Sequence, residues 1–178
     1  MNIVQQVQLT LRAAEYHLNM ALSLIVDDRE YERVFFHVRA YFWELYCVWD
    51  YLLQHANAST LKWKPHLVKG DNTGDFLSKI ELEHSNYAHL NVLRQIQSNA
   101  VFQKVKKMRN YAHKWHYNPV LSMATDGPPS VGNPARSIMI NNSDKKEPGL
   151  PAQVFVERND LEFFKETVEQ LTNLGFFV

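Results

Sequence analysis

Two long amphipathic stretches at the start of the chain constrain its fold more than any other feature. Apolar residues recur every three or four positions from about Asn2 to Val26 and again from about Arg29 to Gln54. This spacing places the apolar side chains on one face of each helix, and Asp27-Asp28 leaves only a short link between them. The sequence therefore predicts an antiparallel helical hairpin.

Shorter helical patterns follow the hairpin. After a loop over Asn57–Gly74, we expect helices at about Asp75–Glu83 and Ala88–Gln97, and then a longer helix from about Ala100 to Tyr117. Asn99 can cap this longer helix, and Asn118-Pro119 ends it. Its predicted core stripe is Val101, Val105, Met108, Ala112 and Trp115.

The chain changes character after the longer helix, because Val120–Pro151 is rich in proline and glycine. Two β-type runs, Arg136–Ile140 and Gln153–Val156, are expected to pair as a hairpin. A last helix is predicted to start at Asn159 as its cap, with Glu162 completing a capping box. We therefore expect one all-α domain over residues 1–178. It is a bundle of four to five helices (core roughly 2–117 and 159–175), with the long loop and small β-hairpin insertion within 118–158.

Composition agrees with a folded intracellular domain. Hydrophobic residues make up 46% of the chain, which is enough for a core. Cys47 is the single cysteine, so an internal disulfide is excluded. The first residues lack the features of a signal peptide, and no apolar stretch approaches the ~20 residues of a membrane span. A cytoplasmic location without membrane contact is expected.

Charge is unevenly distributed in a chain whose formal net charge is zero. No acidic residue lies between Glu83 and Asp126, and that window holds Arg94, Lys104, Lys106, Lys107, Arg109 and Lys114. A concentrated positive segment suggests an anionic partner. The alternative is a solvated basic helix face balanced by acidic neighbours.

One residue group in this window can carry chemistry. Arg109, His113 and His116 follow one line of the predicted helix at the edge of its apolar stripe, and Asn110 lies one step round. A guanidinium there can hold a phosphate through two hydrogen bonds, and an imidazole can transfer a proton near neutral pH. In the alternative reading the histidines simply pack, and Arg109 pairs with Glu44 or Asp50 from another helix.

These residues resemble the signature of the HEPN family (higher eukaryotes and prokaryotes nucleotide-binding domain). That signature is an arginine, often followed by a polar residue, with a histidine after four to six intervening residues. Arg109-Asn110 matches its start, and six residues separate Arg109 from His116, whereas three separate it from His113, one fewer than in the family. The resemblance covers roughly Asn2 to Pro119.

The resemblance implies a bundle of about four core helices that cleaves or binds RNA, often as a dimer. In catalytic members the arginine steadies the scissile phosphate and the histidine transfers the proton of the attacking 2′-hydroxyl, without a metal or cofactor. Asp50 or Glu44 would fill the role of a supporting acidic residue on an earlier helix. Many members of the family are inactive and serve as nucleotide- or RNA-binding modules.

The expected function is therefore that of a HEPN-like RNA-binding or metal-independent RNA-cleaving domain. Its expected context is prokaryotic defence or a toxin–antitoxin pair. Lys106, Lys107 and Lys114 would contact RNA phosphates. The alternatives are a non-catalytic nucleotide- or protein-binding module with the same fold, and an unrelated helical interaction protein.

The expected partners besides RNA or a nucleotide are a second copy of the chain and an antitoxin protein. A homodimer would use the aromatic face of the second helix, with Phe35, Phe36, Phe42, Trp43 and Trp49. The aromatic run of this helix favours core and dimer surface over a base-stacking platform. Among the scattered histidines only His84 and His89 have a spacing worth testing as metal ligands, and no metal or cofactor site is expected.

Overall fold

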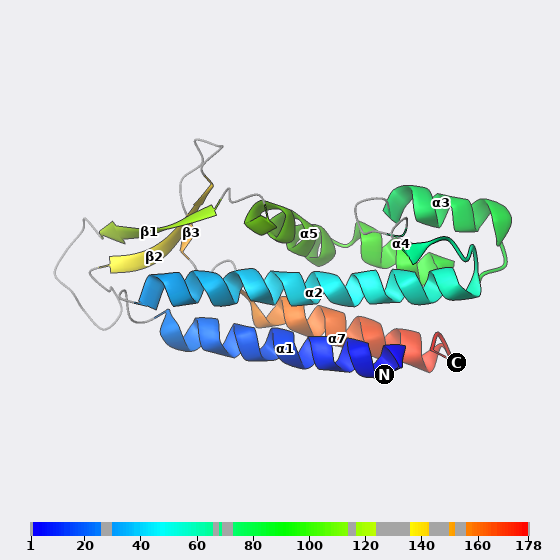
Figure 1. Ribbon diagram of the computed structural model, residues 1–178, viewed down its shortest axis with the longest axis horizontal. Helices are drawn as coiled ribbons and strands as arrows, with labels where there is room; N and C mark the ends of the chain where they lie inside the picture. The colour runs from blue at the N-terminus through cyan, green and yellow to red at the C-terminus, as the bar shows by residue number, and fades with distance from the viewer. Residues whose placement is uncertain are drawn as a thin grey trace.

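The computed structural model describes residues 2–25, 30–65, 68, 73–113, 117–123, 136–142, 150–151 and 156–177. Helices dominate this part of the chain and pack as a bundle (Figure 1). The helices are α1 (Ile3–Leu24), α2 (Tyr31–Ser59), α3 (Thr73–Glu83), α4 (Leu90–Ser98), α5 (Ala100–His113) and α7 (Arg158–Asn173). No helix in the described ranges is both long enough and apolar enough to cross a bilayer.

Helices α1 and α2 form the predicted hairpin, and Figure 1 shows them running antiparallel along most of their lengths. Asn2 caps α1 through a reciprocal capping box with Gln5, in which each side chain bonds the other residue's backbone N–H. Helix α2 continues to Ser59, beyond the predicted end at Gln54, because the buried face extends through Leu53 and Ala56. The predicted loop from Asn57 is thus shorter than expected.

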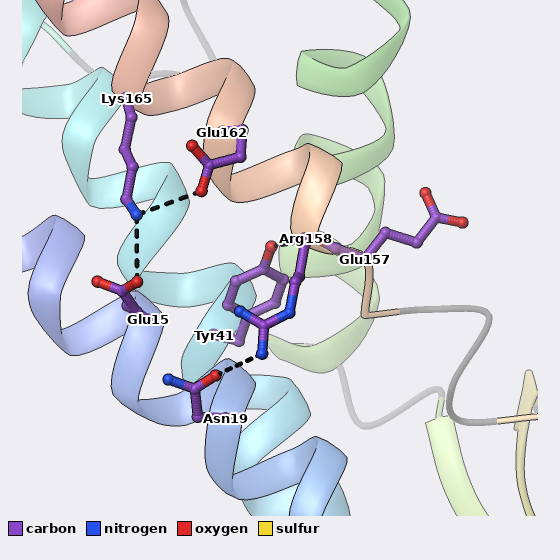
Figure 2. A network of polar contacts seen from close by, with 7 residues as sticks. All are labelled: Glu15, Asn19, Tyr41, Glu157, Arg158, Glu162 and Lys165. Carbon is purple, nitrogen blue, oxygen red and sulfur yellow. Dashed lines mark hydrogen bonds and ion pairs between the residues drawn. The ribbon is translucent and has the colours of Figure 1, made fainter.

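Helix α7 lies against α1 and α2 (Figure 1), and polar contacts fix its first turns. The hydroxyl of the buried Tyr41 donates a hydrogen bond to the Glu157 carbonyl at 2.9 Å. Arg158 donates to the Asn19 side chain at 3.0 Å, and Lys165 reaches Glu15 at 3.2 Å (Figure 2). These contacts join α7 to the two helices of the hairpin, which lie far from it in the sequence.

The predicted start of this helix was wrong. Glu157, not Asn159, is the N-cap, and it makes no side-chain capping bond within the described residues. Glu162 does not complete a capping box but lies 3.3 Å from Lys165, one turn further on. The Glu157 carbonyl instead accepts two hydrogen bonds, from the Asp160 N–H within the helix and from the Tyr41 hydroxyl of α2.

A nearly buried ion pair joins α5 to α7. The Lys104 ammonium lies 2.8 Å from Asp160 and 3.1 Å from Glu157. The Asp160 pKa is raised, mainly because burial disfavours its charged form, while the hydrogen bond and charge of Lys104 act in the opposite direction. Lys104 therefore supports the bundle, although its position in the sequence places it in the basic window.

The chain after α5 differs from the prediction. Tyr117, expected in the helix, begins strand β1 (Tyr117–Met123), which pairs antiparallel with β2 (Arg136–Asn142). Strand β2 also pairs with β3 (Leu150–Pro151), giving the order β1-β2-β3. The run Arg136–Ile140 thus pairs with β1, whose first residue, Tyr117, had been predicted as the end of the preceding helix. Of its expected partner Gln153–Val156, only Val156 is described; it is buried at the entry to α7.

Candidate anion-binding site on helices α2 and α5

The orientation of α5 follows from two fully buried side chains. Phe102 lies 4.9 Å from Trp49 between ring centroids and stacks nearly parallel on Tyr46, and Val105 is buried one turn further along. Asn99 starts the helix as predicted, with its side-chain oxygen accepting the Val101 N–H at 2.8 Å. The buried stripe therefore runs through Phe102 and Val105. Val105 was predicted correctly as part of this stripe, whereas Val101 and Met108 are only partly buried. The predicted Ala112 side chain and Trp115 lie outside the description.

Arg109 continues this stripe toward α2, because it follows Phe102 by seven residues and Val105 by four. Its guanidinium carbon lies 5.2 Å from the ring centroid of Trp43 and 4.8 Å from that of Tyr46. Both distances are within the range of cation–π attraction. One guanidinium N–H also donates to the side-chain oxygen of Asn110 at 2.9 Å. The cation is thus held in a defined, partly buried position.

Three charged groups act on the thiol of Cys47, which lies one turn after Trp43 on the same face of α2. The pKa of Cys47 is raised to about 11, mainly by burial, with further upward effects from Glu44 and Asp50 and a downward effect from Arg109. The two carboxylates and the arginine therefore act on one small region between α2 and α5. Burial also raises the pKa of Glu44. The Cys47 thiol stays protonated at neutral pH, so it is a poor nucleophile.

The supporting acids predicted from the sequence are thus on the helix that faces Arg109. Glu44 and Asp50 lie one turn before and one turn after Cys47. A carboxylate near an arginine can orient it, and a carboxyl with a raised pKa can take part in proton transfer. Both acids and Arg109 act electrostatically on the Cys47 thiol, so all three lie near the contact between α2 and α5.

Two residues of the predicted basic surface are in ion pairs with acidic side chains of the same chain. Lys104 is paired with Asp160 and Glu157, and Arg94 lies 2.8 Å from Glu81. Lys106 is partly buried and Lys107 exposed on α5, on the same helix as Arg109. The predicted contact with an anion therefore concerns Lys106, Lys107 and Arg109 on α5, and not Lys104.

The remaining motif residues are described less fully. His113 is the last residue of α5, one turn beyond Arg109, and its side chain lies outside the description. Lys114 and His116 lie outside the described residues. The expected proximity of Arg109 to either histidine therefore stays a prediction.

The aromatic run of α2 divides between core and surface. Phe42 and Trp49, expected in a dimer face, are 2% and 0% exposed and belong to the core of the same chain, so that part of the prediction was wrong. Phe36 and Trp43 are 61% and 45% exposed. The homodimer stays a prediction with a reduced set of residues. The sequence analysis did not identify Trp43 as the ring beside Arg109. The available signal was the spacing of seven residues between Phe102 and Arg109, which places both side chains on the same side of α5.

Histidines elsewhere do not assemble a metal centre in the described part of the chain, where no group of three or more His, Cys, Asp or Glu side chains is suitably placed. His89 lines a cavity of about 310 Å³ with His55, Tyr87 and Phe176. His55 shares a hydrogen bond of 2.7 Å with the Phe176 carbonyl. His84 lines a neighbouring cavity of about 390 Å³, so the two histidines of the predicted pair line different cavities.

Comparisons of the chain with protein-family profiles, curated proteins and solved structures found no match. The HEPN resemblance therefore depends on the residues of the motif and on the helical bundle that carries it.

Proposed function

We propose that the chain is a HEPN-like RNA-binding domain in which Arg109 holds an RNA phosphate, and that it cleaves RNA without a metal. The observation that carries the proposal is the position of Arg109, whose guanidinium lies within cation–π distance of Trp43 and Tyr46 near the carboxyl end of α5. The neighbouring acids Glu44 and Asp50 agree with the supporting role that the resemblance assigns to an earlier helix.

A guanidinium beside two aromatic rings suits phosphate binding. The rings attract the cation, and its five N–H donors lie in one plane. A phosphate in that plane can accept two parallel hydrogen bonds from a guanidinium, and the aromatic support reduces the side-chain entropy lost on binding.

Cleavage would proceed by attack of the ribose 2′-oxygen on the adjacent phosphorus, while the bond from phosphorus to the 5′-oxygen breaks. The proton of the 2′-hydroxyl passes to a base, and the leaving oxygen receives a proton. His116 has the spacing of the family motif, and His113 lies one turn from Arg109. We assign the proton transfer to His116, with His113 as the residue to test beside it.

The deciding experiment measures degradation and binding of an unstructured labelled RNA in the presence of EDTA. Wild-type protein should cleave the RNA, and Arg109→Ala should lose both cleavage and most of the affinity. Arg109→Lys is the matched control, because it keeps the charge and removes the planar, bidentate donors. Binding without cleavage would favour the non-catalytic module. An Arg109→Ala variant that binds and cleaves like wild type would exclude the proposed site.

A further inference from the structure

We propose that a cavity at one end of the bundle binds a small, uncharged planar amide, with His55 accepting and His89 donating a hydrogen bond. The cavity measures about 310 Å³ and lies where the carboxyl end of α2, the residues before α4 and the chain after α7 meet. Figure 1 places these elements at the end of the bundle away from the β-strands. The lining does not include Arg109, so this ligand is independent of the proposed function.

Aromatic and imidazole rings form a continuous wall of the cavity. Tyr87 meets His89 at a centroid distance of 5.3 Å, and His89 meets Phe176 at 5.2 Å. Phe176 in turn meets His55 at 4.9 Å. The planes of neighbouring rings are inclined by 77°, 88° and 57°. A flat ligand ring can continue this series, because edge-to-face and offset contacts between aromatic rings are favourable.

The acceptor in this wall is the Nδ1 atom of His55. The Nε2 atom of the same ring donates to the Phe176 carbonyl at 2.7 Å, because a carbonyl oxygen can only accept. A neutral imidazole with its hydrogen on Nε2 has a lone pair on Nδ1. His55 is only partly buried, and no hydrogen bond among the described residues uses this lone pair. It therefore remains for an N–H group of a ligand.

The donor is the Nε2 atom of His89. The Nδ1 atom of this ring is buried and has no hydrogen-bond partner in the described part of the chain. A buried N–H group without an acceptor is rarer and more costly than a buried lone pair, so the hydrogen belongs on Nε2. Burial lowers the pKa of His89, and the charge of His55 lowers it further, so the ring is neutral above pH 7.

A neutral donor and a neutral acceptor on one cavity select an amide. A carboxamide can accept from His89 through its C=O and donate to His55 through its N–H, and both groups belong to one flat unit. No lysine or arginine lines the cavity among the described residues, so a carboxylate or phosphate would lose water without meeting a cation. A hydrocarbon ring would cover the two ring nitrogens without satisfying them.

The volume suits a single ring with room for a substituent. About 310 Å³ is at the lower end of the ~300–1,000 Å³ range of small-molecule pockets. An adjoining cavity of about 390 Å³ shares Ser59 and Tyr87 with the first. Its other lining residues are polar and can receive a hydrogen-bonding substituent: Thr60, Glu83, His84, Ser85 and Asn86.

The test titrates the nitrogen-15-labelled protein with benzamide at about pH 8, where imidazoles are neutral. The backbone amide signals of Ser59, Tyr87 and Gly175, which line the cavity, report binding. Benzamide should shift them with a Kd on the order of 1 mM, as expected for so small a ligand. Benzoate replaces the amide by a charge, and N,N-dimethylbenzamide lacks the N–H donor. Both should bind about tenfold more weakly.

His89→Phe is the deciding variant. It keeps a ring beside Tyr87 and Phe176 and removes Nε2 together with the buried, unpartnered Nδ1, so it should fold as well as wild type. Its affinity for benzamide should fall about fivefold, since one neutral hydrogen bond is lost. His84→Phe, at an exposed position in the adjoining cavity, is the matched control and should bind like wild type.

Ala58→Leu tests the location without changing a hydrogen-bonding side chain. Ala58 lines the cavity and is exposed on α2, so a larger side chain should block the ligand and leave the fold intact by circular dichroism. The inference is overturned if benzamide shifts none of the reporting signals, or if benzoate binds as tightly. It is also overturned if Ala58→Leu or His89→Phe binds benzamide like wild type. Arg109→Ala should bind benzamide unchanged, so this inference and the proposed function succeed or fail separately.

Discussion

The Nδ1 atoms of His17 and His37 lie 2.9 Å apart, so a single imidazole hydrogen bond links α1 to α2. The ring centroids are 5.2 Å apart, as expected when the two nitrogens face each other along the line that joins the rings. One Nδ1 must carry a hydrogen and the other must present its lone pair. Two protonated rings would oppose two N–H groups, so the contact is incompatible with a doubly charged pair.

This pair predicts acid sensitivity of the hairpin. Burial is the main cause that lowers the pKa of both histidines. The charge of His37 lowers the pKa of His17 further, and the charge of Arg33 does the same for His37. The unfolded chain therefore binds protons more readily, starting near pH 6.5. The free energy of unfolding should be highest above that pH and should fall as the pH drops through 6.5 toward the lower, folded-state pKa values.

Urea titrations between about pH 8 and pH 5 measure this effect. The double variant His17→Asn/His37→Asn should lose part of the pH dependence, although its stability at pH 8 falls. An unchanged slope in the double variant would assign the acid sensitivity to other groups.

Tyr41→Phe should destabilise the protein by about 1–2 kcal/mol. The substitution leaves the ring in the core but removes the hydroxyl that satisfies the Glu157 carbonyl at the start of α7. The measurement is the free energy of unfolding in urea. Tyr16→Phe, at an exposed ring, is the matched control and should be nearly neutral. Equal effects of the two variants would contradict a docking role for the Tyr41 hydroxyl.

Lys104→Met should destabilise the fold by about 2–4 kcal/mol at neutral pH, because it leaves the buried Asp160 carboxylate without its cation. The Asp160 pKa is already raised, so the folded state accepts a proton there more readily than the unfolded state. The cost of Lys104→Met should therefore shrink as the pH falls toward 4.

A double-mutant cycle isolates this pair. Adding Asp160→Asn to Lys104→Met should recover part of the lost stability at neutral pH, since the uncompensated charge is gone. Additive losses would show that the two side chains do not depend on each other. RNA binding should be unaffected, because Lys104 serves the bundle and not the Arg109 site.

His116→Ala should abolish RNA cleavage while leaving RNA affinity nearly intact, because a proton-transfer group acts in the transition state and adds little to ground-state binding. His113→Ala should retain cleavage. Single-turnover cleavage and equilibrium binding on the same RNA, both with EDTA, measure the two effects. Exchange of the two phenotypes would assign the proton transfer to His113. Full cleavage by both variants would show that neither histidine transfers the proton.

Local sequence determined the helices. The spacing of Val7, Leu11 and Leu18 specifies the buried face of α1 whatever packs on it, because helical periodicity is a property of neighbouring residues. Asn2 and Asn99 cap their helices through bonds that span two or three residues. The helical character of the domain, the first hairpin and the position of Arg109 on a late helix were therefore predictable.

Tertiary structure decided the rest. The start of α7 is held by a hydrogen bond between Tyr41 and Glu157, residues separated by more than a hundred positions. The pairing of β1 with β2 likewise joins residues that are not neighbours in the sequence. Phe42 and Trp43 are adjacent aromatics of similar hydrophobicity, yet one is in the core and the other at the surface. Helical periodicity places Phe42 at the edge of the apolar stripe, but the position of Trp43 beside Arg109 depends on where α5 packs against α2, which periodicity does not contain.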